Sequence, residues 1–255
     1  MTVFGDYSRY YNLLYRDKDY VGEAAYVLGL IRRHAPQTSS LLDLGCGTGV
    51  HACEFARAGY DTLGLDRSEN MLVQAREKQK RRDSGELGRV AFAQGDIRSF
   101  ELSRTFDAIV ALFHVISYLP TDDDLDATFG QIQKHLNPGG IVIFDFWYGP
   151  AVLTDRPSQR VKVLEDKDVK IVRVATPTLH VNDNLVDVRY DLLVIERSSG
   201  HCSEFAENHR MRYLFRPELD ALLSRRGLKP IAFHEWRGEK VPDEKSWNSA
   251  MIARA

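Results

Sequence analysis

Three glycines in a short loop make the most informative stretch of this chain. In LLDLGCGTGV, residues 41–50, Gly45, Gly47 and Gly49 alternate with other residues behind an apolar run. Glycines in a tight turn between a strand and a helix let a ligand approach the backbone, and the helix N-terminus offers N–H donors. A dinucleotide fingerprint would place its last glycine at position 50, which is Val50 here. The spacing therefore favours a ligand without a pyrophosphate.

Two carboxylates follow at the ends of the next two expected strands. Asp66 ends LGLD, where it can accept hydrogen bonds from both hydroxyls of a ribose. Asp96 follows in QGDI, where it can accept from the exocyclic amine of adenine, with Ile97 against the ring. One carboxylate for ribose and one for adenine, without a phosphate cradle, describe an adenosyl ligand that lacks phosphates. We infer S-adenosylmethionine, the donor of methyl groups.

Polar side chains further along the chain are candidates for chemistry on an acceptor. In ALFHVISYLP, His114 and Tyr118 follow an expected strand, and ligands of open α/β sheets bind beyond the carboxyl ends of strands. For Tyr118, a packed tyrosine before a helix is the other interpretation. The alternation of EFAENHRMRYLF places His209 on one face of a strand and Arg212 on the other.

The acidic run TDDDLD, residues 121–126, permits two interpretations. Its carboxylates could hold magnesium. Alternatively, Thr121 caps a helix whose positive end favours Asp122, Asp123 and Asp124. We expect the helix cap and no metal.

Tyrosines at helical spacing lie near the N-terminus. Tyr7, Tyr11 and Tyr15 recur at every fourth position, so they share one helical face. The face could pack into a core. Phenolic hydroxyls are rarely buried without partners, however, and a sulfonium is attracted to aromatic faces, so the helix could instead cover the cofactor.

These residues need a scaffold that gathers loops from several strands. Strands LLDLG, DTLGLD, RVAFAQGD, FDAIVALF and GGIVIFDF alternate with helices VHACEFARAG, SENMLVQAREKQKRR and TDDDLDATFGQIQKHL. Ser68 is expected to cap the second of these helices, and Gly59 to end the first. Strands separated by helices pair in parallel, so we predict an α/β fold with a Rossmann-like, doubly wound, mostly parallel sheet.

The pattern changes near residue 147. Segments from VKVLEDK to NHRMRYLF are β-branched and alternating, with turn signals at Asn182-Asp183 and Ser199-Gly200. They predict an antiparallel sheet inserted into the α/β domain, after which RPELDALLSRRG, IAFHEW and SWNSAMIARA would complete the main sheet. We expect a cofactor-binding domain with an N-terminal helical lid over residues 1–146 and 214–255, and an inserted antiparallel β substrate-binding subdomain over residues 147–213.

Composition limits the partners. The 255 residues are 44% hydrophobic, enough for a large core, and a net charge of −2 gives no general attraction for nucleic acid or an anionic membrane. Cys46, Cys53 and Cys202 form no C-x-x-C pair, and the N-terminus has no apolar targeting segment. We expect a cytoplasmic protein with a small-molecule substrate and no nucleic acid or membrane partner.

The motifs LLDLGCGTG, LGLD, GDI, FDAIVALFHVISYL and NPGG, in this order, resemble the class I S-adenosylmethionine-dependent methyltransferases. The string YYNLLYRDKDYVGEA, followed by SSLLDLGCGTG, resembles in particular the N,N-dimethyltransferases of TDP-linked 3-amino deoxysugars, of the desosamine and mycaminose type. The resemblance implies N-methylation of a nucleotide-linked amino sugar in two successive steps. It also implies a possible homodimer.

The same resemblance assigns residues. Tyr20 would reach the methionyl carboxylate, Tyr11 would lie near the reacting amine, and Tyr118 falls where the sugar enzymes carry a tyrosine or histidine. His209 matches a histidine of those enzymes. The predicted catalytic residues are therefore Tyr118, Tyr11 and His209. The predicted cofactor contacts are Tyr20, Asp43, Gly45, Cys46, Gly47, Asp66, Arg67, Met71, Gly95, Asp96, Ile97 and Leu112.

The acceptor contacts are expected to come from the inserted sheet and the strand before it. Trp147 and Tyr148 follow GGIVIFDF, where they could line the acceptor pocket or form a hinge. The predicted substrate contacts are Tyr11, Trp147, Tyr148, His209 and Arg212. A nucleotide diphosphate needs guanidinium or ammonium donors, for which the candidates are Arg160, Arg173, Arg210 and Arg212.

Four other functions share part of this pattern. A glycine-type small-amine N-methyltransferase or an O-methyltransferase would carry similar motifs, and the former needs a tight carboxylate pocket instead of a nucleotide site. An NAD-dependent oxidoreductase is disfavoured by Val50 and Asp96. A non-catalytic S-adenosylmethionine-binding protein would bind the cofactor without turnover.

Overall fold

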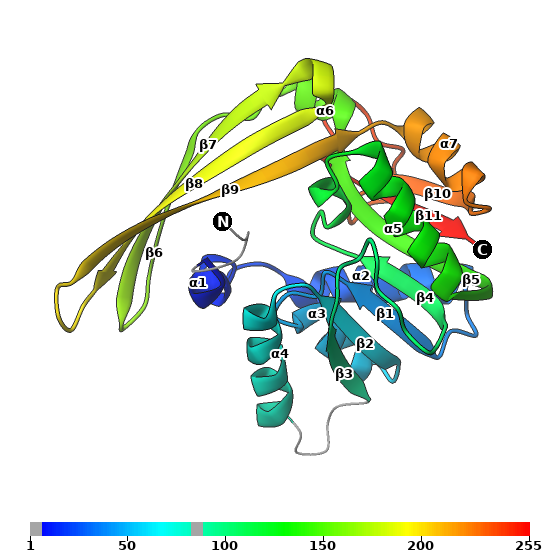
Figure 1. Cartoon of the computed structure of the whole chain (residues 1–255), viewed down its shortest axis with the longest axis horizontal. Helices are drawn as coiled ribbons and strands as arrows, with labels where there is room; N and C mark the ends of the chain where they lie inside the picture. Colours follow the sequence, from blue (N-terminus) through cyan, green and yellow to red (C-terminus); the bar gives the residue numbers. More distant parts are fainter. Residues whose placement is uncertain (1–6, 83–88) are drawn as a thin grey trace.

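The computed structural model describes residues 7–82 and 89–255, with the side chains of residues 7–9 and 81–82 excluded, as a long mixed sheet flanked by helices (Figure 1). The strands are β1 (Ser40–Leu44), β2 (Asp61–Asp66), β3 (Val90–Gln94), β4 (Phe106–Ala111), β5 (Leu136–Tyr148), β6 (Arg160–Glu165), β7 (Val169–His180), β8 (Leu185–Glu196), β9 (Cys202–Leu214), β10 (Lys229–Glu235) and β11 (Asn248–Arg254). The helices are α1 (Tyr7–Leu14), α2 (Tyr20–His34), α3 (Val50–Arg57), α4 (Glu69–Arg82), α5 (Asp122–His135), α6 (Gly149–Thr154) and α7 (Arg216–Arg225), with 3₁₀ turns η1 (Ile116–Tyr118) and η2 (Val181–Asp183).

The main sheet is parallel and doubly wound, as predicted. Its strands lie in the order β3-β2-β1-β4-β5, and β11 and β10 continue it as an antiparallel hairpin on β5. In this order the chain starts in the middle and runs outward in both directions. The carboxyl ends of β1 and β4 therefore meet at one edge, where a crevice forms.

The core occupies both faces of this sheet because its strands alternate. On β4, Ile109 packs toward α5 and α7, whereas Val110 packs toward α2. On β1, Leu42 lies on the same side as Ile109, and Leu41 lies on the same side as Val110. A strand that is apolar on both faces must be covered by helices on both, which is the layering of a doubly wound fold.

The strands β6 to β9 form an antiparallel sheet, as the alternating pattern predicted. Its hairpins turn at η2 with Asn184 in the left-handed region, and at Gly200, whose φ is +70°. β9 joins this sheet to the main sheet by pairing with the end of β5, at Trp147 and Tyr148. The boundaries of separate domains stay a prediction.

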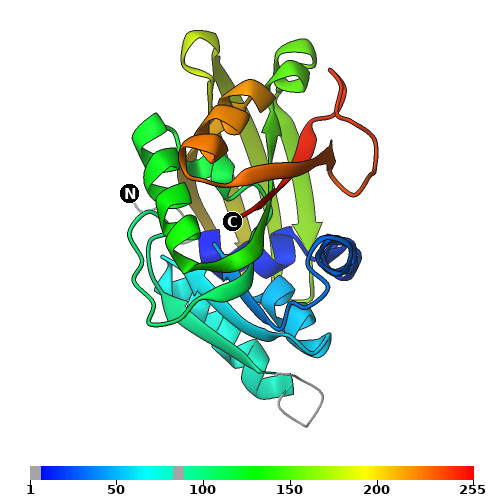
Figure 2. The same ribbon diagram turned by 90° about the vertical axis from the view of Figure 1, so that its right-hand side faces the viewer.

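The helix α1 lies between the two sheets, as Figure 2 shows in blue. Leu14 is fully buried against Ile171 and Leu192 of the inserted strands. Asn12 accepts a hydrogen bond from Thr48 of the glycine loop, with the oxygens 3.1 Å apart. α1 therefore connects the cofactor end of the parallel sheet to the inserted sheet. The side chain of Tyr7, the first tyrosine of the predicted stripe, lies outside the described residues.

Two predicted helix caps are confirmed. The hydroxyl of Ser68 accepts from Met71 N at 3.4 Å, and that of Thr121 accepts from Asp124 N at 3.1 Å. Within residues 7–82 and 89–255, no helix is long and apolar enough to cross a membrane. In the same ranges no three His, Cys, Asp or Glu side chains converge as metal ligands.

Candidate active site

The glycine loop joins β1 to α3 in the conformation that its glycines permit. Gly45, Gly47 and Gly49 have φ values of +67°, +54° and +72°. A Cβ at Gly45 would come within 2.5 Å of Val115, so a side chain there is excluded. At Gly47 a Cβ would meet no atom within 4 Å, and the backbone lies open to a ligand.

Asp66 holds this loop from the end of β2. One of its carboxylate oxygens accepts from Gly47 N and the other from Ser68 N, each at 2.8 Å. Burial raises the pKa of Asp66 despite these bonds. Burial and the charge of Asp66 also raise the pKa of Asp43, beneath the loop, to about 8. The loop is thus tied to an acidic floor, which suits hydroxyl and ammonium donors.

Asp96 follows β3 and is engaged by a residue that the sequence did not single out. Arg98 donates to both of its oxygens, at 2.9 and 2.6 Å, and also reaches Asp124 at 2.8 Å. These hydrogen bonds lower the pKa of Asp96, so its carboxylate stays ionised. Each oxygen keeps a further lone pair for a donor such as an adenine amine.

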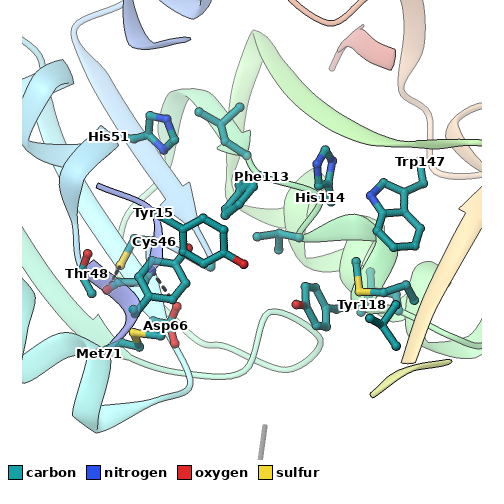
Figure 3. Close-up of a pocket in the computed structure, with 18 of the residues that line it drawn as sticks. Tyr15, Cys46, Thr48, His51, Asp66, Met71, Phe113, His114, Tyr118 and Trp147 are labelled. Carbon is teal, nitrogen blue, oxygen red and sulfur yellow. Dashed lines mark hydrogen bonds between the residues drawn. The ribbon is translucent and has the colours of Figure 1, made fainter. Parts of the chain in front are cut away.

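A cavity of about 690 Å³ opens at this edge of the sheet (Figure 3). In Figure 3, Cys46, Asp66 and Met71 lie on one side, and His114 and Trp147 lie on the other. The cavity is lined by all the residues predicted to contact the cofactor, namely Tyr20, Asp43, Gly45, Cys46, Gly47, Asp66, Arg67, Met71, Gly95, Asp96, Ile97 and Leu112. Their contacts with the cofactor itself stay predictions.

Aromatic side chains from the N-terminal helices form one wall of the cavity. The ring centroids of Tyr11 and Tyr15 are 4.7 Å apart, and Tyr15 packs edge-on against Phe113 at 5.1 Å. Tyr20 stands against His51 at 5.0 Å, and burial raises its pKa, so its phenol remains a hydrogen-bond donor. This wall offers π faces to a cation and a hydroxyl to a carboxylate, which fits a sulfonium and an amino acid.

Tyr118 and His209, predicted as catalytic, are brought together across the two sheets. The Tyr118 hydroxyl lies 2.7 Å from His209 Nδ1, and His209 Nε2 lies 3.3 Å from a Glu207 carboxylate oxygen. With Nδ1 accepting from the phenol, Nε2–H donates to Glu207. Tyr118 lines the cavity, but His209 is 2% exposed and lies behind it. His209 therefore lies behind Tyr118 and Tyr190, which line the cavity, and does not line it itself.

Besides His209, two more of the predicted acceptor contacts do not reach the cavity. β5 extends to Tyr148, so Trp147 and Tyr148 are strand neighbours that point to opposite faces. Trp147 lines the cavity, whereas Tyr148 packs on Phe233 with centroids 5.5 Å apart. Arg212 is buried and is likewise absent from the lining of the cavity.

Pairing also distinguishes the four arginine candidates for a diphosphate. Arg212 donates to Asp122 at 2.7 Å and to Glu218 at 3.1 Å, and Arg210 is paired with Asp187 on the outer surface. Arg160 lies on β6 and Arg173 on the adjacent strand β7, and both line the cavity. Only these two are placed to meet a ligand there.

Sequence reasoning missed two charged clusters at the cavity. Asp145 is fully buried on β5, and one of its oxygens lies 2.8 Å from Nδ1 of His114. Glu23 of α2 binds Lys18 and His51 beneath the aromatic wall. A lone carboxylate in the apolar run IVIFDF was a usable signal for the first, since a buried charge requires a partner. For the cluster around Glu23, no regular spacing in the sequence links its members.

The sequence of this chain matches those of known methyltransferases. A family model described as a methyltransferase domain matches residues 41–140. The dTDP-3-amino-3,4,6-trideoxy-α-D-glucopyranose N,N-dimethyltransferase of Streptomyces venezuelae is 32% identical over 88% of this chain and 90% of its own length. The dTDP-3-amino-3,6-dideoxy-α-D-glucopyranose N,N-dimethyltransferase of Streptomyces fradiae is 29% identical over 88% and 84%.

Solved structures share the fold throughout. DesVI of Streptomyces venezuelae superposes with a TM-score of 0.80 at 28% identity, covering 98% of each chain. S-adenosylmethionine-bound CalS10, an amino pentose methyltransferase from Micromonospora echinaspora, superposes with a TM-score of 0.75 at 27% identity over 100% of this chain and 98% of its own. The chain therefore belongs to the S-adenosylmethionine-dependent methyltransferases, with S-adenosylmethionine as its cofactor, and resembles the dTDP-aminosugar N,N-dimethyltransferases among them.

Proposed function

We propose that this enzyme methylates the amino group of a TDP-linked amino deoxysugar, and that it does so twice. The observation that carries the proposal is the cavity itself, which continues from the glycine loop to Arg160 and Arg173 on the inserted sheet. A small amine such as glycine needs no such extension. Relatives that match along most of the chain act on dTDP-linked amino sugars, which supports the same conclusion.

The diphosphate would lie against the arginine pair. The guanidinium of Arg173 stands over the rings of Tyr190 and Tyr15, at 5.0 and 5.9 Å from their centroids. A guanidinium is planar because its charge is delocalised, and its fork of donors binds phosphate oxygens in pairs. The two rings would help to hold it in place. The sugar would then extend from the inserted sheet toward Tyr118.

The bound cofactor supplies an electrophilic methyl group on a positively charged sulfur. The chain has to hold that group in line with an amine, and orientation alone contributes about 7 to 11 kcal/mol to such a reaction. Tyr11 and Tyr15 would present π faces to the positive charge, and Asp66 would anchor the ribose. Since a monomethylated amine keeps a lone pair, the same arrangement serves a second transfer.

Tyr118 would position the sugar rather than remove a proton. Burial raises the pKa of its phenol well above the usual range, so the hydroxyl stays protonated. Its proton is directed to His209, which Glu207 orients in turn. We expect His209→Ala to slow turnover without abolishing it, because the change loosens Tyr118 and leaves the donor and acceptor in place.

Mass spectrometry of TDP-3-amino deoxysugars incubated with the enzyme and S-adenosylmethionine tests the proposal. A gain of one and then two methyl masses is the expected result. Glycine and the corresponding 3-hydroxy sugar serve as competing acceptors in parallel samples. Methylation of glycine alone, or of the hydroxyl sugar alone, would refute the amino-sugar assignment while keeping the methyltransferase.

Three further predictions accompany this proposal. They are the division into a cofactor-binding domain and an inserted substrate-binding subdomain, a homodimer, and a location in the cytoplasm. Light scattering of the purified chain measures the second, since a dimer has twice the 29.1 kDa of one chain.

A further inference from the structure

The loop after β4 places a histidine in an unusual backbone conformation at the cavity. Phe113 and His114 have φ values of +65° and +62°, a region that residues with side chains rarely adopt. Two such residues in succession persist only where surrounding contacts determine them, and they concentrate at functional sites. The result is that the His114 ring lines the cavity between Phe113 and Trp147, at centroid distances of 5.5 and 6.2 Å.

Asp145 holds this conformation from the neighbouring strand. Both of its oxygens accept from the backbone N–H of His114, at 3.1 and 3.2 Å, and one approaches Nδ1 at 2.8 Å. The last contact is close but not aligned as a hydrogen bond, so the hydrogen bonds that hold His114 are those to its backbone N–H. Asp145 is fully buried, whereas the His114 side chain is 15% exposed. With Nδ1 against the carboxylate, the other ring nitrogen, Nε2, is left for a ligand.

The other ionisable groups near the His114 ring are engaged elsewhere and do not serve as a proton acceptor. Lys18 stands 4.3 Å from the centroid of the Phe113 ring, and Tyr15 packs edge-on against the same ring. Tyr118, in the next turn of chain, directs its hydroxyl to His209. Amines of the alkyl type are mostly protonated near neutral pH, and an ammonium has no lone pair for attack. The site therefore needs a proton acceptor beside the amine.

We propose that His114, held by Asp145, accepts the proton of the substrate ammonium. This inference rests on the proposed function. In the step, an N–H bond of the ammonium breaks and its electron pair stays on nitrogen, while the proton binds Nε2. Asp145 compensates the charge on the ring. The nitrogen lone pair then forms a bond to the methyl carbon as the carbon–sulfur bond breaks, with its electron pair leaving on sulfur.

His114→Gln and His114→Gly test the step through pH dependence and rescue. We expect kcat/KM of His114→Gln to fall about 10²-fold or more at pH 7. The deficit should shrink above about pH 9, where solvent itself deprotonates more of the amine. His114→Gly keeps the left-handed backbone without strain and leaves room for a base, so added imidazole should restore activity. Cofactor affinity should match the wild type.

A binding measurement gives a readout that is separate from turnover. Without methyl donor, calorimetry compares the TDP-amino sugar with its 3-hydroxy analogue in wild type and in His114→Gly. The wild type should prefer the amino sugar, and the preference should drop about tenfold in His114→Gly, which has no side-chain acceptor for the ammonium. The matched control is His180→Gln, because His180 lies 3.0 Å from Asp187 outside the cavity. It should behave as wild type.

The outcomes separate this inference from the proposed function. A wild-type enzyme that methylates no amine overturns both. Methylation by the wild type, with His114→Gln equally active at every pH, overturns only the role of His114. A deficit in His114→Gln that is the same at all pH values, with no rescue of His114→Gly by imidazole and an unchanged binding preference, assigns a structural role to the ring and also overturns the proposal.

Discussion

Replacing Glu23 by glutamine should destabilise the folded protein substantially. Glu23 lies on α2 with its side chain 9% exposed, and it binds Lys18 and His51, the latter at 2.9 Å. Burial raises the pKa of this carboxyl, but the hydrogen bonds from His51 and Lys18 outweigh burial and hold the pKa at about 2. The carboxylate is therefore strongly favoured in the folded state.

The magnitude follows from that pKa. A fall from the ordinary 4.5 to about 2, at about 1.36 kcal/mol for each pH unit, gives about 3 kcal/mol of stability. The folded-state pKa is depressed, so this contribution is complete above about pH 5 and is lost as the pH falls from 4.5 toward 2. At pH 3.5 about 2 kcal/mol should remain. Glu23→Gln forfeits the charge at every pH.

Urea unfolding of the wild type and Glu23→Gln at pH 7.5 and pH 3.5 measures both quantities. The loss should be about 3 kcal/mol at pH 7.5, or about 6 to 12 °C in Tm, and smaller at pH 3.5. Glu101→Gln is the control, since Glu101 and Lys134 form an exposed pair whose side chains are 71% and 54% accessible. It should unfold as the wild type does. A loss below about 1 kcal/mol, or one that does not shrink in acid, would refute the reasoning.

Three further predictions concern the site. Asp66→Ala should weaken S-adenosylmethionine binding tenfold or more by calorimetry, since a hydrogen bond to a charged group contributes about 1.5–3 kcal/mol; an unchanged Kd would contradict its role. Tyr118→Phe should lower kcat without abolishing turnover, and complete inactivity with intact cofactor affinity would count against the weight given to orientation. Gly49→Ala should lower Tm more than Gly47→Ala does. Both glycines have positive φ, but only at Gly49 would a Cβ come within 2.6 Å of Phe92; equal losses would exclude that steric cause.

The sequence by itself determined the parallel sheet, the glycine loop and the cofactor. These features depend on neighbours in the chain, because strand and helix periods, cap residues and a positive φ are local requirements. Asp66 and Asp96 could be placed because parallel strands bring their carboxyl ends to one edge. Alternation also predicted the inserted antiparallel sheet and its turns.

Only the tertiary structure decided which side chains face the cavity. Tyr148 and Arg212 have side chains of a suitable type, but strand alternation turns them away from the cavity. That β5 extends as far as Tyr148 could not be read from its apolar run. Two contacts join residues that are far apart in the chain. His114 and Asp145 are 31 positions apart, and Glu23 and His51 are 28 positions apart. Such pairings arise from how the elements pack, for which a single sequence contains no local signal.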